Sequence, residues 1–153
     1  MKYRFFLFDL DNTLWDFEEN ARDCIVELIH RHGVQKYIPD PGKFYELYKA
    51  NNVTLWALYE AGQITQQKLR HVRFEITFEQ SGVPDATVLG SIFGEQYLEL
   101  MPTKTKLVPH AREVLEYLTG KGCKMALVTN GFKQVQYQKV RNSGLDLFFG
   151  NRI

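Results

Sequence analysis

Cysteine is scarce in this sequence: the 153 residues include two, Cys24 and Cys123, which lie far apart in apolar stretches. This excludes a small fold built on disulfides, and we expect buried, reduced thiols in a reducing compartment. An excess of charge is also absent, because 19 basic and 18 acidic side chains leave a net charge of +1. A chain with this balance is not expected to have nucleic acid or an anionic membrane as its main partner.

Long hydrophobic runs are missing as well. No stretch approaches the roughly 18 apolar residues of a membrane-spanning helix, and the apolar N-terminus reaches Asp9 too soon for a signal peptide. We find no internal repeat and no low-complexity segment. The hydrophobic share of 44% and the charged share of 24% are typical of a globular protein. The sequence therefore predicts a soluble, cytoplasmic protein.

Two short apolar runs are typical of strands that are covered on both faces of a parallel sheet. The first covers residues 3–8 and the second covers residues 124–129. An Asn-Gly pair and an expected helix over residues 132–142 follow the second run, and another expected helix over residues 108–119 precedes it. This order of elements predicts an α/β fold.

Residues 9–123 separate the two runs, far more than a connection between neighbouring parallel strands needs. Apolar residues at helical spacing fill most of this segment. We expect a helix that ends at Gly33, one around 44–48, one before Gly62, one from a Thr65 cap to Gly82, and one around 88–97. The sequence thus predicts a helical subdomain at residues 16–100, inserted into an α/β core of residues 1–15 and 101–153.

Asp9 and Asp11 directly follow the first apolar run, in the stretch FDLDNTL. Open α/β sheets bind ligands at the carboxyl ends of their strands, so this position favours a function. An isolated Asp-x-Asp can also serve only as a turn, with Asn12 or Thr13 capping the next helix. Two carboxylates this close are costly, however, unless a cation such as Mg²⁺ neutralises them. With a metal bound, one carboxylate could attack phosphorus while the other transfers protons.

FDLDNTL resembles the first motif of the haloacid dehalogenase (HAD) superfamily, hhhDxDxT, and LVTNGF at residues 127–132 resembles the second. The resemblance implies a Rossmann-like parallel sheet and a Mg²⁺-dependent phosphomonoesterase that acts through an aspartyl phosphate. It implies that Asp9 is the nucleophile and Asp11 the acid/base. The metal ligands would be the Asp9 side chain and the Asp11 backbone carbonyl.

The second motif implies where the phosphate binds. Thr129 is expected to donate a hydrogen bond to it, together with Asn130 and Gly131. Gly131 permits close approach of the backbone, and the N–H groups that open the next helix favour an anion. On its own, Thr-Asn-Gly is equally compatible with a simple turn in which Asn130 caps the helix.

The inserted helices resemble the helical cap of this superfamily, which closes over the site and selects the substrate. DNTLWDF, and VTNGF followed by a Gln-rich helix, are similar to the pyrimidine 5′-nucleotidase branch. The expected substrate is therefore a small phosphorylated metabolite, a nucleoside 5′-monophosphate. The alternatives are a phosphatase or phosphomutase acting on a sugar phosphate or phosphoglycolate, and a non-catalytic phosphate-binding module.

Two parts of the superfamily's site are not found. Lys133 and Lys139 lie in the helix directly after the second motif, too early for the family's lysine, and Asp146 is the only acid after Gly131. We therefore expect the chain to be truncated at its C-terminus and its metal site to be incomplete. Apart from His30 and His32, which on a helix would point to different faces, the histidines show no metal-ligand spacing. We expect Trp15, Trp56 and Tyr59 to lie in the core rather than against a nucleobase.

Overall fold

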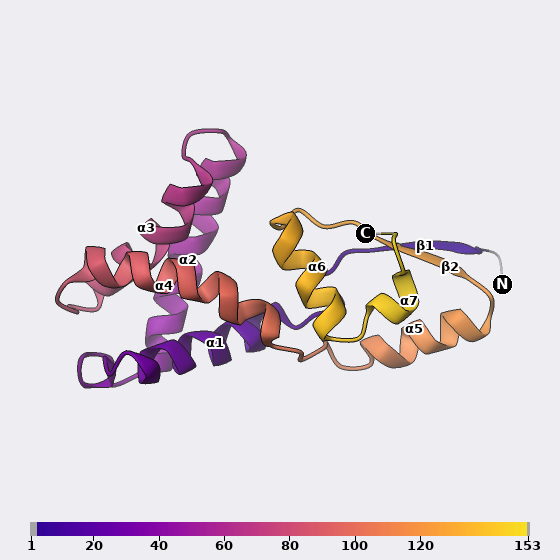
Figure 1. Ribbon diagram of the computed structural model, residues 1–153, viewed down its shortest axis with the longest axis horizontal. Helices are drawn as coiled ribbons and strands as arrows, with labels where there is room; N and C mark the ends of the chain where they lie inside the picture. Colours follow the sequence, from indigo (N-terminus) through magenta and orange to yellow (C-terminus); the bar gives the residue numbers. More distant parts are fainter. Residues whose placement is uncertain (1–2, 153) are drawn as a thin grey trace. The chain divides into compact units, whose positions relative to one another are not determined.

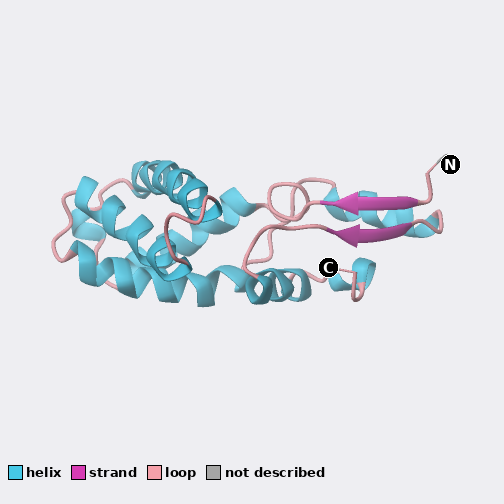
Figure 2. Cartoon of the chain, turned by 90° about the horizontal axis from the view of Figure 1, so that it is seen from above, coloured by secondary structure: helices cyan, strands magenta, loops and turns pink. Residues whose placement is uncertain are grey.

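The computed structural model describes residues 3–152, and the chain divides into two compact units (Figure 1). The first unit joins the N-terminal segment up to Ala21 to the segment from Leu100 onward, and the second unit runs from Arg22 to Glu99. The first contains the two strands, and the second is built from helices (Figure 2). Among the described residues, none of the helices combines the length and apolar character needed to span a bilayer.

The first unit is built on two parallel strands, β1 (Phe5–Phe8) and β2 (Lys124–Leu127). They pair in register, and the backbone N–H of Val128 continues the ladder to the Phe8 carbonyl at 2.8 Å. Figure 2 shows the two arrows pointing the same way. The strands therefore end at one edge of the sheet, where the chain continues into the first and the second motif.

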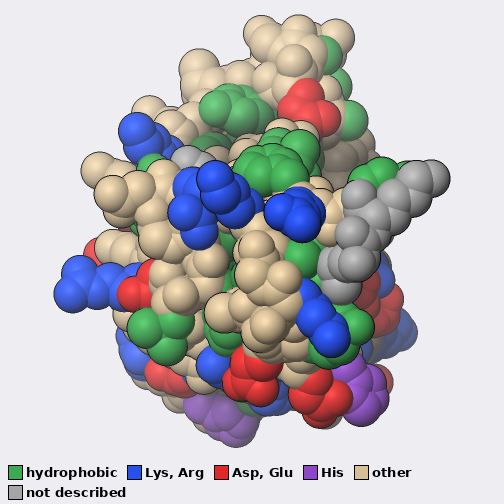
Figure 3. All heavy atoms as spheres, turned by 90° about the vertical axis from the view of Figure 1, so that its right-hand side faces the viewer, with side chains coloured by type: hydrophobic (Ala, Val, Ile, Leu, Met, Phe, Trp, Pro, Cys, Tyr) green, Lys and Arg blue, Asp and Glu red, His purple; other side chains and the backbone are tan. Residues whose placement is uncertain are grey.

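The prediction that both faces of the strands are covered is wrong for β1. Phe5 and Leu7 are 55% and 65% exposed, whereas Met125 and Leu127 of β2 are buried on the other face. Phe149 covers that other face and meets Phe8 edge-on, with ring centroids 6.1 Å apart. Within residues 3–152, β2 is the only strand that pairs with β1. Figure 3 shows one face of the molecule, where hydrophobic side chains lie at the surface among charged ones.

Three helices complete the first unit: α5 (Ala111–Gly120), α6 (Lys133–Asn142) and α7 (Asp146–Phe149). The two helices expected around the second strand are confirmed, and they begin at Ala111 and Lys133. α6 packs against a short 3-10 turn, η2 (Met101–Thr103), where Asn142 Nδ2 donates to the Pro102 carbonyl at 2.9 Å. This packing fixes α6 beside the segment that returns from the inserted helices.

The inserted segment forms four helices: α1 (Phe17–Arg31), α2 (Pro41–Glu60), α3 (Gln66–Gln80) and α4 (Ala86–Leu100), with a 3-10 turn, η1 (Gln35–Tyr37). The Thr65 cap is confirmed, since its hydroxyl accepts from the backbone N–H of Lys68 at 3.2 Å. The two helices expected at 44–48 and before Gly62 form one continuous helix, α2. Asn51 and Asn52, in its middle, are held by contacts with Thr77 and Arg73 of α3.

Two glycines on α4 let it approach α3 closely. A Cβ atom at Gly90 would lie 2.8 Å from the Glu75 backbone nitrogen, and one at Gly94 would lie 2.7 Å from the Arg70 carbonyl oxygen. Aromatic rings fill the space around this crossing, among them Phe78 and Phe93, which meet edge-on at 4.8 Å. Backbone contact of this kind tolerates no larger residue without a shift of one helix.

The same unit buries one arginine among aromatic rings. Arg73 is 3% exposed, and its guanidinium carbon lies 5.0 Å from the ring centroid of Tyr97 and 5.8 Å from that of Tyr48. Its Nη1 donates to Asn52 Oδ1 at 3.0 Å. Burial raises the pKa of both tyrosine hydroxyls, which keeps them neutral in the folded state.

Candidate active site

In the loop after β1, one backbone carbonyl group accepts several hydrogen bonds. The backbone N–H groups of Leu14 and Trp15 both donate to the Leu10 carbonyl at 2.9 Å. These three side chains are buried, and Trp15 is fully so, which confirms its expected place in the core. The apolar residues thus anchor the loop, while Asp9 stays exposed and Asp11 is half-buried.

Asp9 is the first residue beyond β1. Its Oδ2 accepts a hydrogen bond from the hydroxyl of Thr13 at 3.0 Å. Thr13 is the threonine of the hhhDxDxT pattern, so the loop that carries Asp9 also orients its carboxylate. The sequence suggested only a capping role for this threonine.

The carboxylate of Asp11 is held by two side chains of α6. Lys139 Nζ lies 2.8 Å from Oδ1 and 3.1 Å from Oδ2, and Gln136 Nε2 donates to Oδ2 at 2.9 Å. Lys139 is 3% exposed and Gln136 is 2% exposed. Burial lowers the pKa of the Lys139 ammonium, while the charge of Asp11 acts in the opposite direction and favours the charged amine.

Gln136 also connects the first motif to the second. Its Nε2 donates to Thr129 Oγ1 as well as to Asp11 Oδ2. Gly131 makes room for this side chain, because a Cβ atom there would lie 2.5 Å from Gln136 Cδ. Of the predicted phosphate-binding residues, Thr129 and Gly131 therefore meet the side chain that binds Asp11, and Asn130 is exposed.

A hollow of about 210 Å³ lies beside these groups. Thr129, Gly131 and Gln136 line it, together with Lys133 and Tyr137 from the first turns of α6. The N-terminus of a helix carries partial positive charge and unpaired N–H groups, and Lys133 adds a full positive charge. This combination favours an anion the size of phosphate.

The family model for haloacid dehalogenase-like hydrolases matches residues 3–153 of this chain. The chain belongs to this family. Its recognition from the two sequence motifs is confirmed, and so is the predicted α/β class of the fold.

Three proteins are similar to this chain over most of its length. It is 28% identical to the pyrimidine 5′-nucleotidase PynA of Streptococcus pneumoniae, over 97% of this chain and 60% of PynA. It is 32% identical to the ribulose-1,5-bisphosphate 5-phosphatase of Halopiger xanaduensis, over 91% of this chain and 57% of that protein. A crystal structure of the HAD-hydrolase YfnB from Bacillus subtilis, bound to magnesium, superposes with a TM-score of 0.80 at 27% identity.

The YfnB match covers 97% of this chain and 62% of YfnB. This chain spans about 60% of the length of the curated relatives that it matches. Within residues 3–152, no group of three or more His, Cys, Asp or Glu side chains is arranged so that it could hold a metal ion. Asp9 and Asp11 are the acidic residues at the strand ends.

Sequence reasoning missed two residues of this HAD site, Gln136 and Lys139. In the sequence, Lys139 lies too early in the chain for the family's lysine, and Gln136 belongs to neither motif. Gln136, Lys139, Val140 and Ser143 recur at helical spacing and are all buried in the structure, but three of the four are polar, so the sequence does not mark this face as buried. A polar residue on the buried face of a helix needs a partner, and the DxD loop supplies one.

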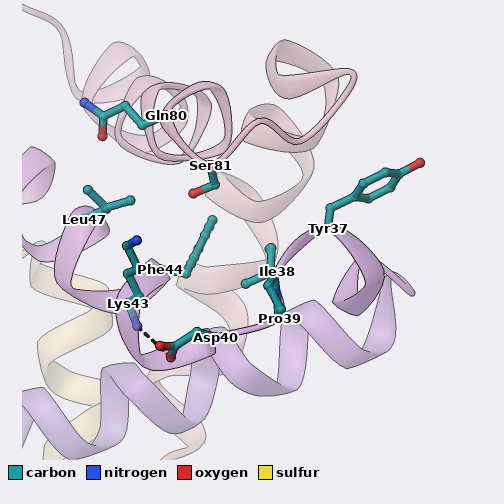
Figure 4. A pocket seen from close by; sticks show the side chains of 9 residues that line it. All are labelled: Tyr37, Ile38, Pro39, Asp40, Lys43, Phe44, Leu47, Gln80 and Ser81. Carbon is teal, nitrogen blue, oxygen red and sulfur yellow. Dashed lines mark hydrogen bonds between the residues drawn. The ribbon is translucent and has the colours of Figure 1, made fainter.

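The helical unit contains hollows of its own. One of about 240 Å³ lies between η1, the start of α2 and the end of α3 (Figure 4). Its acidic side chain, Asp40, accepts from the backbone N–H of Lys43 and caps α2, as the dashed line in Figure 4 shows. Phe44, Ile38 and Leu47 form its apolar wall, and Asp40 and Lys43 are the charged residues that line it.

Proposed function

We propose that the protein is a Mg²⁺-dependent phosphomonoesterase that hydrolyses a small phosphorylated metabolite, a nucleoside 5′-monophosphate, through an aspartyl phosphate on Asp9. One observation carries this proposal: Asp11 and Thr129, from the two motifs, accept hydrogen bonds from the same amide nitrogen of Gln136, beside a hollow that suits an anion. Because β1 and β2 are parallel neighbours in register, Asp9 leaves the sheet at the same edge.

The chemical tasks of the proposed reaction divide among these residues. An oxygen of Asp9 forms a bond to phosphorus as the bond to the leaving alcohol breaks, and Asp11, which enters this step protonated, gives that alcohol its proton. Asp11 next takes a proton from a water molecule, whose oxygen attacks the phosphorus of the aspartyl phosphate. This second step releases inorganic phosphate and restores Asp9. Thr129 and the N–H groups that open α6 bind the phosphoryl oxygens throughout.

The residues at the strand ends fit a magnesium ion. Mg²⁺ is bound in proteins by one or two carboxylates, with water and phosphate oxygens completing its shell. The Asp11 carboxylate is occupied by Lys139 and Gln136, so the proposed ligands are the side chain of Asp9 and the backbone carbonyl of Asp11. The ion would draw charge from the phosphoryl group and reduce its repulsion from Asp9. The magnesium-bound structure of YfnB supports this choice of ion.

The helical insertion at residues 16–100 is proposed to act as a cap that excludes water and selects the substrate. Its compact part, from Arg22 to Glu99, is joined to the strand-bearing unit at both of its ends. The likeness to PynA favours a pyrimidine nucleotide. The likeness to ribulose-1,5-bisphosphate 5-phosphatase, at 32% identity, makes a sugar phosphate the second candidate substrate.

A substrate panel tests the proposal. The protein is expressed from its complete reading frame, and phosphate release is measured from UMP, dTMP, AMP, ribulose 1,5-bisphosphate and phosphoglycolate, with Mg²⁺ or with EDTA. We expect Mg²⁺-dependent release that is fastest with the pyrimidine nucleotides. Asp9→Asn should abolish turnover, and Asp146→Asn, at an exposed position on α7, is the matched control. Fastest release from a sugar phosphate would favour the second candidate, and full activity of Asp9→Asn would refute the mechanism.

A further inference from the structure

We propose that Lys139 and Gln136 are positioning residues of this site: they fix the Asp11 carboxylate for proton transfer, and Gln136 also aims the Thr129 hydroxyl at the phosphate. The inference rests on the proposed function, because it gives α6 a role in the same reaction. It goes beyond that function by assigning roles to two residues outside both sequence motifs.

The ammonium group of Lys139 lies in an apolar surrounding, with the Asp11 carboxylate as its ion-pair partner. Its ammonium lies 4.3 Å from the ring centroid of Trp15 and 5.2 Å from that of Phe17, so aromatic surface encloses it beside the Asp11 carboxylate. A buried ammonium is stabilised by an opposite charge close by, and Asp11 supplies this charge at 2.8 Å whenever its carboxyl group is deprotonated. Because Lys139 contacts both carboxylate oxygens, it restrains the rotation of the carboxylate as well as its position.

Gln136 acts on two groups through one amide. An NH₂ group carries two hydrogens, which matches its two acceptors, Asp11 Oδ2 and Thr129 Oγ1. The reverse orientation of the amide would bring its carbonyl oxygen against the carboxylate of Asp11, which is repulsive. The contact with Asp11 therefore determines which end of the amide faces Thr129.

This orientation determines what the Thr129 hydroxyl can do. A hydroxyl that accepts from Gln136 keeps its own hydrogen for another acceptor. The hollow beside Thr129 is where such an acceptor would bind, and a phosphoryl oxygen fits the anion-favouring groups that line it. Gln136 thus links Asp11, the proposed acid/base, to Thr129, the proposed phosphate-binding donor. A substitution that displaces Gln136 should therefore affect both residues.

Steady-state kinetics of the protein from its complete reading frame test these roles. Lys139→Met keeps the length of the side chain and removes its charge, Lys139→Arg keeps the charge, and Arg141→Met on the exposed side of α6 is the control. We expect Lys139→Met to lower kcat by about 10- to 100-fold, the range of a disturbed acid/base, with KM changed by less than about threefold. Lys139→Arg should recover much of kcat, and Arg141→Met should match the unmodified protein.

Gln136→Met provides a second test, with Gln138→Met at an exposed position as its control. We expect lower kcat together with higher KM, because Gln136 acts on both Asp11 and Thr129. Unfolding midpoints verify that each variant is folded. Unchanged kcat in folded Lys139→Met or Gln136→Met, or no recovery in Lys139→Arg, would overturn the positioning roles while leaving the proposed function intact. Absence of turnover in the unmodified protein would instead refute the proposed function, and this inference with it.

Discussion

The ammonium of Lys139 lies 2.8 Å from one carboxylate oxygen of Asp11 and 3.1 Å from the other. The two residues are 128 positions apart in the chain, and the whole helical insertion lies between them. The pair therefore joins the loop after β1 to α6, the helix after β2. Because this ion pair holds the loop and the helix together, it contributes to the stability of the first unit and also fixes the position of Asp11 in the candidate site.

The first prediction concerns the energy of this pair. Asp11→Asn and Lys139→Met should each lower the free energy of unfolding, by about 1–3 kcal/mol, because each leaves a charged partner without its counterion. The double variant should lose less than the sum of the two, with a coupling of at least about 0.5 kcal/mol. Denaturant unfolding of the four proteins measures this coupling. Strictly additive losses would mean that the pair does not form in solution.

The second prediction concerns Gly131. A Cβ atom at this position would lie 2.5 Å from Gln136 Cδ and 2.7 Å from its Nε2, so Gly131→Ala should displace the amide from Asp11 and Thr129. We expect kcat to fall and KM to rise as in Gln136→Met, by about tenfold or more in kcat/KM. The control is Gly120→Ala, where the added methyl group meets nothing within 4 Å. Wild-type kinetics in Gly131→Ala would show that Gln136 is not held as described.

The sequence predicts those parts of the site that local patterns determine. A short apolar run followed by Asp9 and Asp11, and a second run that ends at Thr129, can each be recognised within a few residues of the chain. Parallel pairing of β1 and β2 then brings the motifs to one edge. The Thr65 cap is correct for the same reason, because a cap depends on the three residues that follow it.

The remaining features depend on contacts between distant segments. Lys139 and Gln136 look like solvated residues of a Gln-rich helix, but both are buried where α6 meets Asp11 and Trp15. The exposure of Phe5 and Leu7 likewise depends on which segments cover β1, which an apolar run cannot reveal. The unbroken α2 has a similar cause, since contacts with α3 hold its central asparagines.

The third prediction concerns the crossing of α3 and α4. Gly94→Ala places a methyl group 2.7 Å from the Arg70 carbonyl oxygen, so the helices must separate, at a cost of about 1–3 kcal/mol. Amide hydrogen exchange should become faster in α3 and α4, with little change of its rate in β1 and β2. Gly120→Ala, in a helix with open space around it, should be neutral or stabilising by up to about 1 kcal/mol. If amide hydrogen exchange in α3 and α4 is equally fast in Gly94→Ala and in the unmodified protein, the two helices do not cross as closely as described.

The fourth prediction concerns stability at alkaline pH. Burial raises the pKa of Tyr48 and of Tyr97 above its usual value of about 10, and Arg73 opposes the shift in both. In the unfolded chain these hydroxyls lose their protons near pH 10, whereas the folded protein keeps them, so unfolding releases protons above that pH. The contribution of the two tyrosines is therefore fully present below about pH 10 and is lost as pH rises toward their pKa values in the folded state.

Unfolding midpoints measured between about pH 8 and pH 11 test this dependence. Tyr97→Phe keeps the ring among Tyr48, Phe74 and Arg73 but removes one ionising hydroxyl, so its stability should fall less steeply above about pH 10. The matched control is Tyr117→Phe on α5, where the tyrosine is 59% exposed. The control should keep the slope of the unmodified protein, since its hydroxyl is open to water. If Tyr97→Phe also keeps that slope, Tyr97 ionises in the folded protein as readily as in the unfolded chain, and its proposed contribution to alkaline unfolding is wrong.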